Sequence, residues 1–269
     1  MNAGPPMGIL KRWLRQKLES AGYFVFNVRT PGLYAQDGLF TFNNSHFAQD
    51  QEFQAAYARG VLASRGVDPK IEWRVHVALW AARAALQVPG DFVECGVNAG
   101  FVSSAIMHHL GWQGVDKTFY LIDTFRGPVL SQYSNEEVQR GQRKVAEDAI
   151  AKGAYVTDLD RVRANYAEWP NARTVQGAVP EVLETLALDR VAFLHLDMNC
   201  AGPERAAFEY FWEKLSPGGL VLLDDYAMHG YDDLAAGIDG AARERGANVL
   251  SLPTGQGLIW KLRLPTPCC

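Results

Sequence analysis

The distribution of apolar and polar residues predicts short buried strands that alternate with amphipathic helices from residue 91 onward. Continuous apolar runs such as residues 191–196 and 220–223 are typical of strands covered on both faces, and hence of a parallel sheet. No full helix separates the last two strands, so we expect them to form an antiparallel hairpin. The expected strands are residues 91–95, 118–122, 173–176, 191–197, 219–224, 247–251 and 257–262, and the expected helices lie near residues 101–110, 135–151, 179–187, 203–215 and 232–245.

A different pattern occupies the residues before the first of these strands. Residues 9–18 have helical spacing with basic side chains on one side, which favours a packed helix with a solvated face over a membrane-surface or partner helix. Residues 23–45 are rich in aromatic residues, Gly and Asn, and we expect irregular structure there. Further helices are expected over residues 50–63 and 71–86.

These patterns divide the chain into three parts. We expect residues 1–70 to form an N-terminal extension that serves as a lid or an oligomer contact, so the protein is predicted to be a homo-oligomer. Residues 71–264 are expected to form the main α/β domain. Residues 265–269 are expected to be a disordered tail.

A turn with two glycines joins the first of these strands to the helix that follows. Glu94, Gly96 and Gly100 give the spacing Glu-x-Gly-x-x-x-Gly, which brings bare backbone and the unpaired N–H groups of a helix close to a ligand. The Gly-x-Gly-x-x-Gly spacing of dinucleotide folds is absent, and an acidic residue here would repel a pyrophosphate but suit an amino group or a sulfonium. The alternative is a plain strand–helix turn without a ligand.

Composition narrows the class of protein and of partner. The 48% hydrophobic and 21% charged content is that of a soluble globular protein, and a net charge of −4 without a basic run argues against nucleic acid. No apolar run is long enough to span a bilayer, and the N-terminus lacks the apolar core of a secretory signal. The four cysteines lack Cys-x-x-Cys spacing, so we expect a reduced, cytoplasmic protein without a membrane partner.

Acidic and amide side chains follow the strands, and ligands of open α/β sheets bind beyond these carboxyl ends. Asp123 is placed to accept both hydroxyls of a ribose, and Gln176 is placed to meet the edge of a base. Asp197, Asp224 and Asp225 are expected to converge, where they would repel one another unless a cation lay among them. Oxygen-only ligands favour Mg²⁺. The alternative is that the paired aspartates merely cap the following loop.

Four motifs, in order, resemble those of the class I S-adenosylmethionine-dependent methyltransferases, in particular the macrocin O-methyltransferase family of sugar-tailoring enzymes. The resemblance covers residues 71–262 and implies a Rossmann-like α/β fold: a mostly parallel seven-stranded sheet with a C-terminal antiparallel hairpin, preceded by a helical or irregular extension. The motifs are Glu94-Cys-Gly-Val-Asn-Ala-Gly, Leu121-Ile-Asp-Thr-Phe, Leu196-Asp197 and Gly218-Gly-Leu-Val-Leu-Leu-Asp-Asp-Tyr226.

The resemblance also implies a set of binding residues. Mg²⁺ would be held by Asp197, Asp224 and Asp225, in a site similar to that of the catechol O-methyltransferases. S-adenosylmethionine would lie over the glycine turn, with its ribose on Asp123. Arg74, on the preceding helix, is a candidate for the carboxylate of the cofactor, and the alternative is a solvated charge. The expected cofactor-binding residues are Arg74, Glu94, Gly96, Asn98, Gly100, Ser103, Asp123 and Gln176.

One departure from the family pattern concerns the general base. The sugar-tailoring enzymes commonly read Leu-Asp-Gly-Asp after the fourth strand, but the second aspartate is Asn199 here, and an amide cannot take a proton at neutral pH. The lysine of the catechol enzymes would fall near Cys200. Either the metal alone acidifies the acceptor, or His229 or Tyr226 removes the proton; we expect His229. His195 is expected to be a packed core histidine.

The resemblance implies a Mg²⁺-dependent O-methyltransferase that moves a methyl group from S-adenosylmethionine to a hydroxyl of a small molecule. A sugar or another vicinal diol is the expected acceptor, as in natural-product tailoring. Asp197 and His229 are the expected catalytic residues. The alternatives are a protein that binds the cofactor without methyl transfer, or an aminopropyl-type transferase on the same fold.

Overall fold

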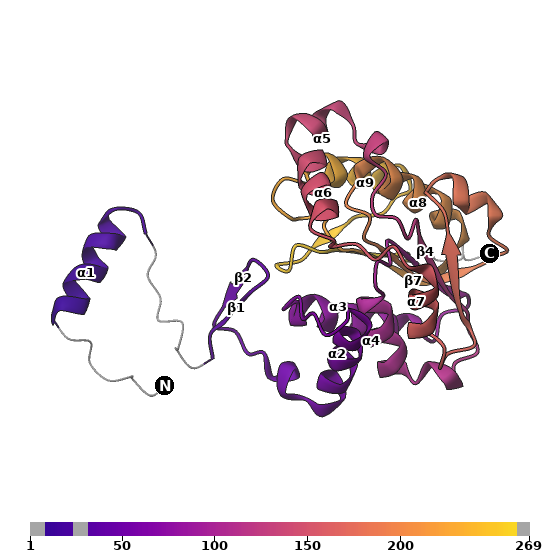
Figure 1. Ribbon diagram of the computed structural model, residues 1–269, viewed down its shortest axis with the longest axis horizontal. Coiled ribbons are helices and arrows are strands. Elements are labelled where there is room, and N and C mark those ends of the chain that lie inside the picture. The colour runs from indigo at the N-terminus through magenta and orange to yellow at the C-terminus, as the bar shows by residue number, and fades with distance from the viewer. Residues whose placement is uncertain (1–8, 24–31, 263–269) are drawn as a thin grey trace, which may run out of the picture. The chain divides into compact units, whose positions relative to one another are not determined.

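The structure is a computed structural model, which describes residues 9–23 and 32–262 (Figure 1). The chain forms two compact units, Met1–Ser45 and His46–Cys269. The predicted tail, residues 265–269, lies outside the described residues, as does part of the predicted irregular segment, residues 23–45. Among the described residues, none of the helices combines the length and the apolar character that crossing a bilayer requires.

The first unit contains one helix and one hairpin. Helix α1 (Ile9–Ser20) lies where a helix was predicted. Strands β1 (Tyr34–Gln36) and β2 (Leu39–Thr41) pair in antiparallel register, within a segment that was predicted to be irregular. The two residues between them, Asp37 and Gly38, have positive φ angles of 52° and 70°. Asp-Gly is a favoured sequence for such a two-residue turn, and this local signal outweighs the mixed composition around it.

The second unit is built on a seven-stranded sheet with the order β5-β4-β3-β6-β7-β9-β8. Strands β3 to β7 are parallel to one another, whereas β9 runs antiparallel to both β7 and β8. The predicted parallel sheet and terminal hairpin are therefore confirmed. The strands are β3 (Asp91–Cys95), β4 (Phe119–Asp123), β5 (Ala172–Gln176), β6 (Val191–Leu196), β7 (Leu215–Leu223), β8 (Leu250–Ser251) and β9 (Gly257–Trp260).

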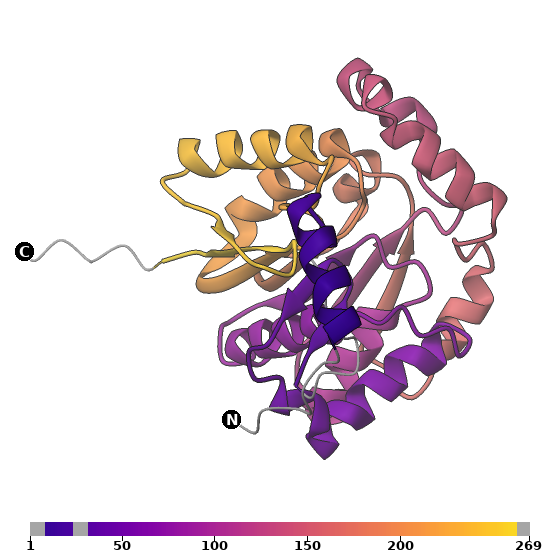
Figure 2. The same ribbon diagram turned by 90° about the vertical axis from the view of Figure 1, so that its left-hand side faces the viewer.

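Helices cover both faces of this sheet (Figure 2). Alternate strand residues serve the two faces: Phe92 and Phe193 pack with α2, α3 and α4, whereas Val93 and Leu194 pack with α8 and α9. Burial of each such side chain contributes about 1.5–3 kcal/mol, so the sheet is stabilised from both sides. The helices are α2 (Gln51–Ala63), α3 (Glu72–Ala85), α4 (Phe101–Leu110), α5 (Asn135–Gln139), α6 (Gln142–Ala151), α7 (Leu159–Asn165), α8 (Ala201–Lys214) and α9 (Asp232–Glu244).

Three helical segments differ from the predicted pattern. The helix expected over residues 135–151 is two helices, α5 and α6, because Gly141 between them has a φ of 84°, which no right-handed helix accepts. The helix expected near residues 179–187 is a 3₁₀ segment, Glu181–Thr185. Helix α7 was not predicted, although Asp158 caps it by accepting a hydrogen bond from the backbone N–H of Arg161.

Helix α2 belongs to the second unit, although it lies within the predicted extension of residues 1–70. It packs closely against α4: a Cβ added to Gly60 would lie 2.8 Å from the carbonyl oxygen of Phe101. The close packing requires a residue without a side chain at this point of α2. A function of residues 1–70 as a lid or an oligomer contact stays a prediction.

Candidate functional site

A cavity of about 230 Å³ lies at the carboxyl ends of strands β3 to β6. Open α/β sheets bind their ligands at this edge, where the strand order reverses. Here the reversal lies at β3, because β4 and β5 follow on one side of β3 and β6 and β7 follow on the other. Four predicted site residues, Gly96, Asn98, Asp123 and Asp197, line it. The remaining lining residues are Ile122, Thr124, Gly127, Pro128, Val129, Gln132, Tyr155, Gly177, Ala178, Val179, Met198, Asn199, Cys200 and Pro203.

The turn after β3 is fastened to the neighbouring strand ends. Gly96 has a φ of 93°, and a Cβ there would lie 1.8 Å from the carbonyl oxygen of Asp197. Glycine at this position therefore allows the turn and the end of β6 to approach each other. The backbone N–H of Asn98 donates to Oδ2 of Asp123 at 2.8 Å, and Oδ1 of Asn98 accepts from the N–H of Val156 at 2.8 Å.

Asp123 ends β4 and receives hydrogen bonds on both carboxylate oxygens. Oδ1 accepts from the N–H of Phe125 at 2.6 Å and from the hydroxyl of Thr124 at 3.3 Å. Oδ2 accepts from Asn98, and a carboxylate oxygen has two lone pairs, so this oxygen has capacity for a further donor from a ligand.

Five predicted cofactor residues, Arg74, Glu94, Gly100, Ser103 and Gln176, do not line the cavity. Gly100 begins α4 with a φ of 86°, and a Cβ there would lie 2.0 Å from the hydroxyl oxygen of Tyr166. Ser103 is buried, with its hydroxyl 2.8 Å from the same Tyr166 oxygen. The amide of Gln176 donates to the carbonyl of Thr124 at 3.0 Å, whereas its neighbour Gly177 lines the cavity. Ser103 thus supports the helix behind the turn.

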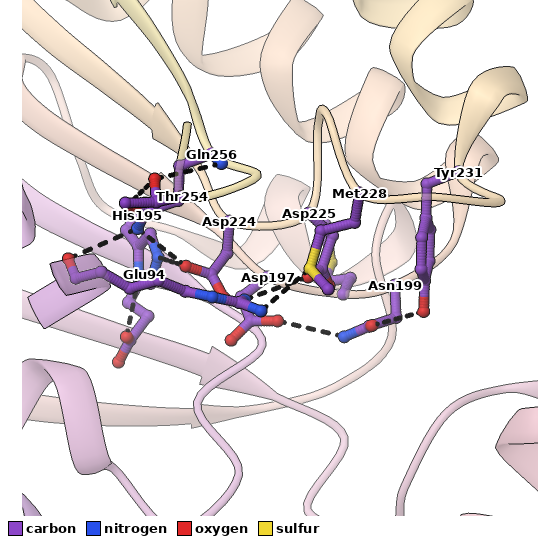
Figure 3. A network of polar contacts seen from close by, with 12 residues as sticks. Glu94, His195, Asp197, Asn199, Asp224, Asp225, Met228, Tyr231, Thr254 and Gln256 are labelled. Atoms are coloured by element: carbon purple, nitrogen blue, oxygen red, sulfur yellow. Dashed lines mark hydrogen bonds and ion pairs between the residues drawn. The ribbon is translucent and has the colours of Figure 1, made fainter. Parts of the chain in front are cut away.

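The predicted aspartate trio forms a tight cluster beside this cavity (Figure 3). One carboxylate oxygen from each of Asp197, Asp224 and Asp225 lies within 4.8 Å of the others. Burial raises the pKa of Asp197 well above its usual value, and the negative charges of Asp224 and Asp225 raise it further. The cluster therefore has an excess of negative charge that a cation would relieve.

Arg74, on α3, lies against this cluster rather than in solvent. Its Nη1 is 2.6 Å from Oδ2 of Asp224 and 3.2 Å from Oδ1 of Asp225, and its Nη2 is 2.9 Å from Sδ of Met228. The side chain is 10% exposed, so the alternative of a solvated charge is wrong. A contact between Arg74 and the carboxylate of a cofactor stays a prediction.

His195, near the carboxyl end of β6, lies between two carboxylates. Its Nδ1 is 2.9 Å from Oε1 of Glu94, and its Nε2 is 3.8 Å from Oδ1 of Asp224, which also accepts from Gln256 at 3.0 Å. Burial opposes the charged imidazolium, but the contacts with Asp224 and Glu94 outweigh burial and raise the pKa of His195 to about 10. His195 is thus buried, as predicted, but it is also an ion-pair partner.

The same contacts set the charge states of the two carboxylates. Burial opposes ionisation of Asp224, yet the positive charges of nearby His195 and Arg74 lower the pKa of Asp224 below its usual value. Oε2 of Glu94 is buried and has no hydrogen-bond partner among the described residues. A buried acceptor without a donor is costly, so this oxygen suits a ligand that donates.

Asn199 connects the cluster to the loop after β7 (Figure 3). Its amide donates to Oδ1 of Asp197 at 3.0 Å, and its Oδ1 accepts from the hydroxyl of Tyr231 at 2.9 Å. Oε1 of Glu204 accepts from the backbone N–H groups of Met198 and Asn199, at 2.9 and 3.0 Å. Sequence reasoning missed Tyr231 and Glu204; only the place of Glu204 in the first turn of α8 was a signal for it.

The two candidates for a general base lie in different surroundings. The hydroxyl of Tyr226 donates to Oδ1 of Asp239 at 2.7 Å, so it faces α9. His229 is exposed in the loop between β7 and α9, without a hydrogen bond or ion pair to the described part of the chain. A role for His229 stays a prediction.

The sequence matches a family of known proteins over more than half of its length. A model of the family described as Macrocin-O-methyltransferase (TylF) matches residues 75–237, more than half of the chain. A relative from Streptomyces olivaceus, named 8-demethyl-8-(2,3-dimethoxy-alpha-L-rhamnosyl)-tetracenomycin-C 4'-O-methyltransferase, is 28% identical over 65% of this chain and 66% of its own length. Mycinamicin III 3''-O-methyltransferase of Micromonospora griseorubida is 27% identical over 54% and 61%. The matched region thus spans less than two thirds of these relatives.

Two solved structures resemble the fold. The O-methyltransferase NovP has a TM-score of 0.59 at 20% identity, over 71% of this chain and 80% of its own. Calicheamicin methyltransferase CalS11 has a TM-score of 0.52 at 13% identity, over 97% and 99%. These likenesses confirm the predicted class I methyltransferase fold.

Proposed function

Because the chain belongs to the macrocin O-methyltransferase family, we propose that it transfers a methyl group from S-adenosylmethionine to a hydroxyl group of a small molecule. One observation carries the proposal. A single cavity is lined both by the turn and carboxylate expected to bind the cofactor, Gly96, Asn98 and Asp123, and by Asp197 of the aspartate cluster. A methyl donor and an acceptor held at these two ends would therefore meet.

The cofactor fits the groups that are free to bind it. The ribose hydroxyls would donate to Asp123, and the amino group of the methionine end would donate to the buried, unpartnered Oε2 of Glu94. The backbone of Gly96 and Asn98 would lie beneath the cofactor, with Gly177 on the far side of the cavity. Charge-assisted bonds of this kind are about twice as strong as neutral ones.

The aspartate cluster fits Mg²⁺, since three oxygen donors converge and their burial leaves negative charge uncompensated. When bound, the ion would lower the pKa of an acceptor hydroxyl. The protein's own contribution is orientation: Asn199 holds Oδ1 of Asp197, and Gln256 holds Oδ1 of Asp224. These bonds fix the carboxylates before a substrate arrives.

The proposed chemistry is an in-line displacement. The acceptor oxygen forms a bond to the methyl carbon while the carbon–sulfur bond breaks, so the sulfonium leaves as a neutral thioether. The hydroxyl proton goes to His229, which we assign as the general base because Asn199 cannot take a proton and Tyr226 faces α9. The sulfonium is already activated, so the main task of the protein is alignment.

For the acceptor we propose a hydroxyl on a sugar of a glycosylated natural product. The two relatives named above carry names of this kind, one a rhamnosyl 4'-O-methyltransferase and one a 3''-O-methyltransferase. A vicinal diol would reach the cluster with two oxygens, which selects the oxygen that reacts. We also propose that the protein acts as a homo-oligomer.

The test combines calorimetry with a transfer assay. S-adenosylmethionine should bind the purified protein, and transfer to a panel of rhamnosides and other vicinal diols should require Mg²⁺ and stop with EDTA. Asp224→Asn should sharply lower turnover while leaving cofactor affinity nearly unchanged. Absence of cofactor binding would refute the proposal; binding without transfer to any acceptor would favour a protein that only holds the cofactor.

A further inference from the structure

We infer that Arg74 is a resident cation of the aspartate cluster, which holds Asp224 and Asp225 when no metal is bound and opposes the binding of a divalent ion. The inference rests on one part of the proposed function, namely that the aspartate cluster binds a metal ion. It concerns the affinity for that ion, which the proposed reaction does not specify.

The position of the guanidinium indicates that Arg74 and a divalent ion compete for the oxygens of Asp224 and Asp225. A single nitrogen, Nη1, contacts both Oδ2 of Asp224 and Oδ1 of Asp225, so these two oxygens converge on the guanidinium. Its other terminal nitrogen, Nη2, lies 2.9 Å from Sδ of Met228, which is a weak acceptor. A divalent ion would require oxygens of the same two aspartates that Nη1 contacts.

Burial makes the competition strong. The side chains of Arg74, Asp224 and Asp225 are 10%, 9% and 8% exposed, so water screens their charges little. A second cation bound to the same oxygens would lie close to the guanidinium and be repelled by it. Either the guanidinium withdraws on metal binding, or the ion binds against this repulsion; both lower the affinity for metal.

The charge balance of the cluster predicts how loss of Arg74 changes the affinity for a divalent ion. Within the described part of the chain, the carboxylates of Glu94, Asp197, Asp224 and Asp225 lie close to the cations Arg74 and His195. Arg74→Gln removes one of these cations and leaves a shorter, neutral polar side chain. The carboxylates then lose the compensating charge of Arg74 in the metal-free protein, which destabilises it, and they attract a divalent ion more strongly.

The experiment measures Mn²⁺ binding to the full-length protein by electron paramagnetic resonance, and the thermal unfolding midpoint in EDTA and in excess Mn²⁺. We expect Arg74→Gln to raise the Mn²⁺ affinity by roughly tenfold, equivalent to about 1.4 kcal/mol. Its midpoint should fall in EDTA and rise more than that of the parent on addition of Mn²⁺. Arg74→Lys, a cation without the planar fork, should bind Mn²⁺ with an affinity between those of the parent and Arg74→Gln.

Arg83 provides the matched control on the same helix. It is exposed, and its guanidinium contacts His109, so Arg83→Gln should bind Mn²⁺ like the parent. An unchanged or weaker Mn²⁺ affinity in Arg74→Gln would overturn the inference, as would the absence of Mn²⁺ binding in both proteins. If Arg74→Gln does not fold, an Arg74→Lys affinity at or below that of the parent overturns it.

The same samples also test the proposed function independently of the role of Arg74. S-adenosylmethionine affinity, measured by calorimetry in EDTA, reports on the cofactor cavity without the metal. A parent protein that does not bind the cofactor would refute the methyltransferase proposal, while a higher Mn²⁺ affinity in Arg74→Gln would still support the role of Arg74.

Discussion

Asp123 has two tasks at the scale of a single residue. Its carboxylate fastens the turn after β3 by accepting from the N–H of Asn98, and it closes its own loop by accepting from the N–H of Phe125. In the proposed complex it also accepts from the ribose of the cofactor. A neutral side chain of the same shape would keep part of the hydrogen bonding to the backbone but weaken the contact with the ribose. Mutation can therefore separate the structural role of Asp123 from its proposed role in cofactor binding.

Asp123→Asn is expected to weaken binding of S-adenosylmethionine. Hydrogen bonds to a charged group contribute about 1.5–3 kcal/mol, so the dissociation constant should rise by about tenfold or more. Calorimetry measures this change, and Asp160→Asn, on the exposed face of α7, is the control because its carboxylate contacts only Arg163 in that helix. Equal affinities in Asp123→Asn and the parent would show that the ribose binds elsewhere.

At the scale of elements, the loop after β6 is held from two helices. Glu204 of α8 accepts from the N–H groups of Met198 and Asn199, and Glu137 of α5 accepts from the N–H of Ala201 at 2.9 Å. Both carboxylates are buried. The loop carries Asp197 and Asn199, and Asn199 has a positive φ of 57°, so these contacts stabilise a conformation that the loop would rarely adopt alone.

Glu204→Gln is expected to reduce the pH dependence of stability. Burial, and then the charge of Asp225, raise the pKa of Glu204 from 4.5 to about 8. Between these values the folded protein keeps a proton that the unfolded chain has lost, so the free energy of unfolding falls as the pH rises. The amide of Gln keeps the Oε1 acceptor but does not titrate, so this fall should be smaller in the variant.

Urea unfolding in EDTA at pH 5 and pH 8 measures this difference. Glu213→Gln, on the exposed side of the same helix, should retain the pH dependence of the parent. An identical fall in Glu204→Gln and the parent would mean that Glu204 is already ionised in the folded protein, contrary to the raised pKa.

The whole molecule consists of two compact units, and the candidate site lies in one of them. Every residue that lines the described cavity, and every aspartate of the cluster, falls within His46–Cys269. The first unit contributes α1 and the β1–β2 hairpin. We therefore predict that the first unit acts as a lid over the acceptor or as an oligomer contact, and that it does not bind the cofactor.

Deletion of residues 1–45 is expected to leave S-adenosylmethionine affinity within about twofold of the parent, a difference of about 0.4 kcal/mol. Turnover of the acceptor, or the mass of the oligomer in solution, should fall, because the deleted unit is proposed as a lid or an oligomer contact. Calorimetry, the transfer assay and light scattering measure the three quantities. A large loss of cofactor affinity would contradict the placement of the site within the second unit.

Much of the fold follows from local patterns. Runs of apolar residues and the glycine turn predicted all seven strands of the main sheet and the antiparallel hairpin, because each signal lies within a few neighbouring residues. Motif order identified the family, and the family model confirms it. The incorrect predictions also depend on a few neighbouring residues. Hydrophobic periodicity predicted one helix where Gly141 separates two, and the mixed composition around Asp37-Gly38 concealed a hairpin.

The sequence by itself determined the sheet, the residues at its carboxyl edge and the convergence of Asp197, Asp224 and Asp225, since parallel strands bring their ends to one edge whatever the loops do. Only the tertiary structure decided the partners of these residues. Arg74 meets Asp224 across 150 positions of sequence, and Tyr231 meets Asn199 across 32. Such contacts depend on how a helix or loop packs on the sheet, and no spacing along the chain encodes them.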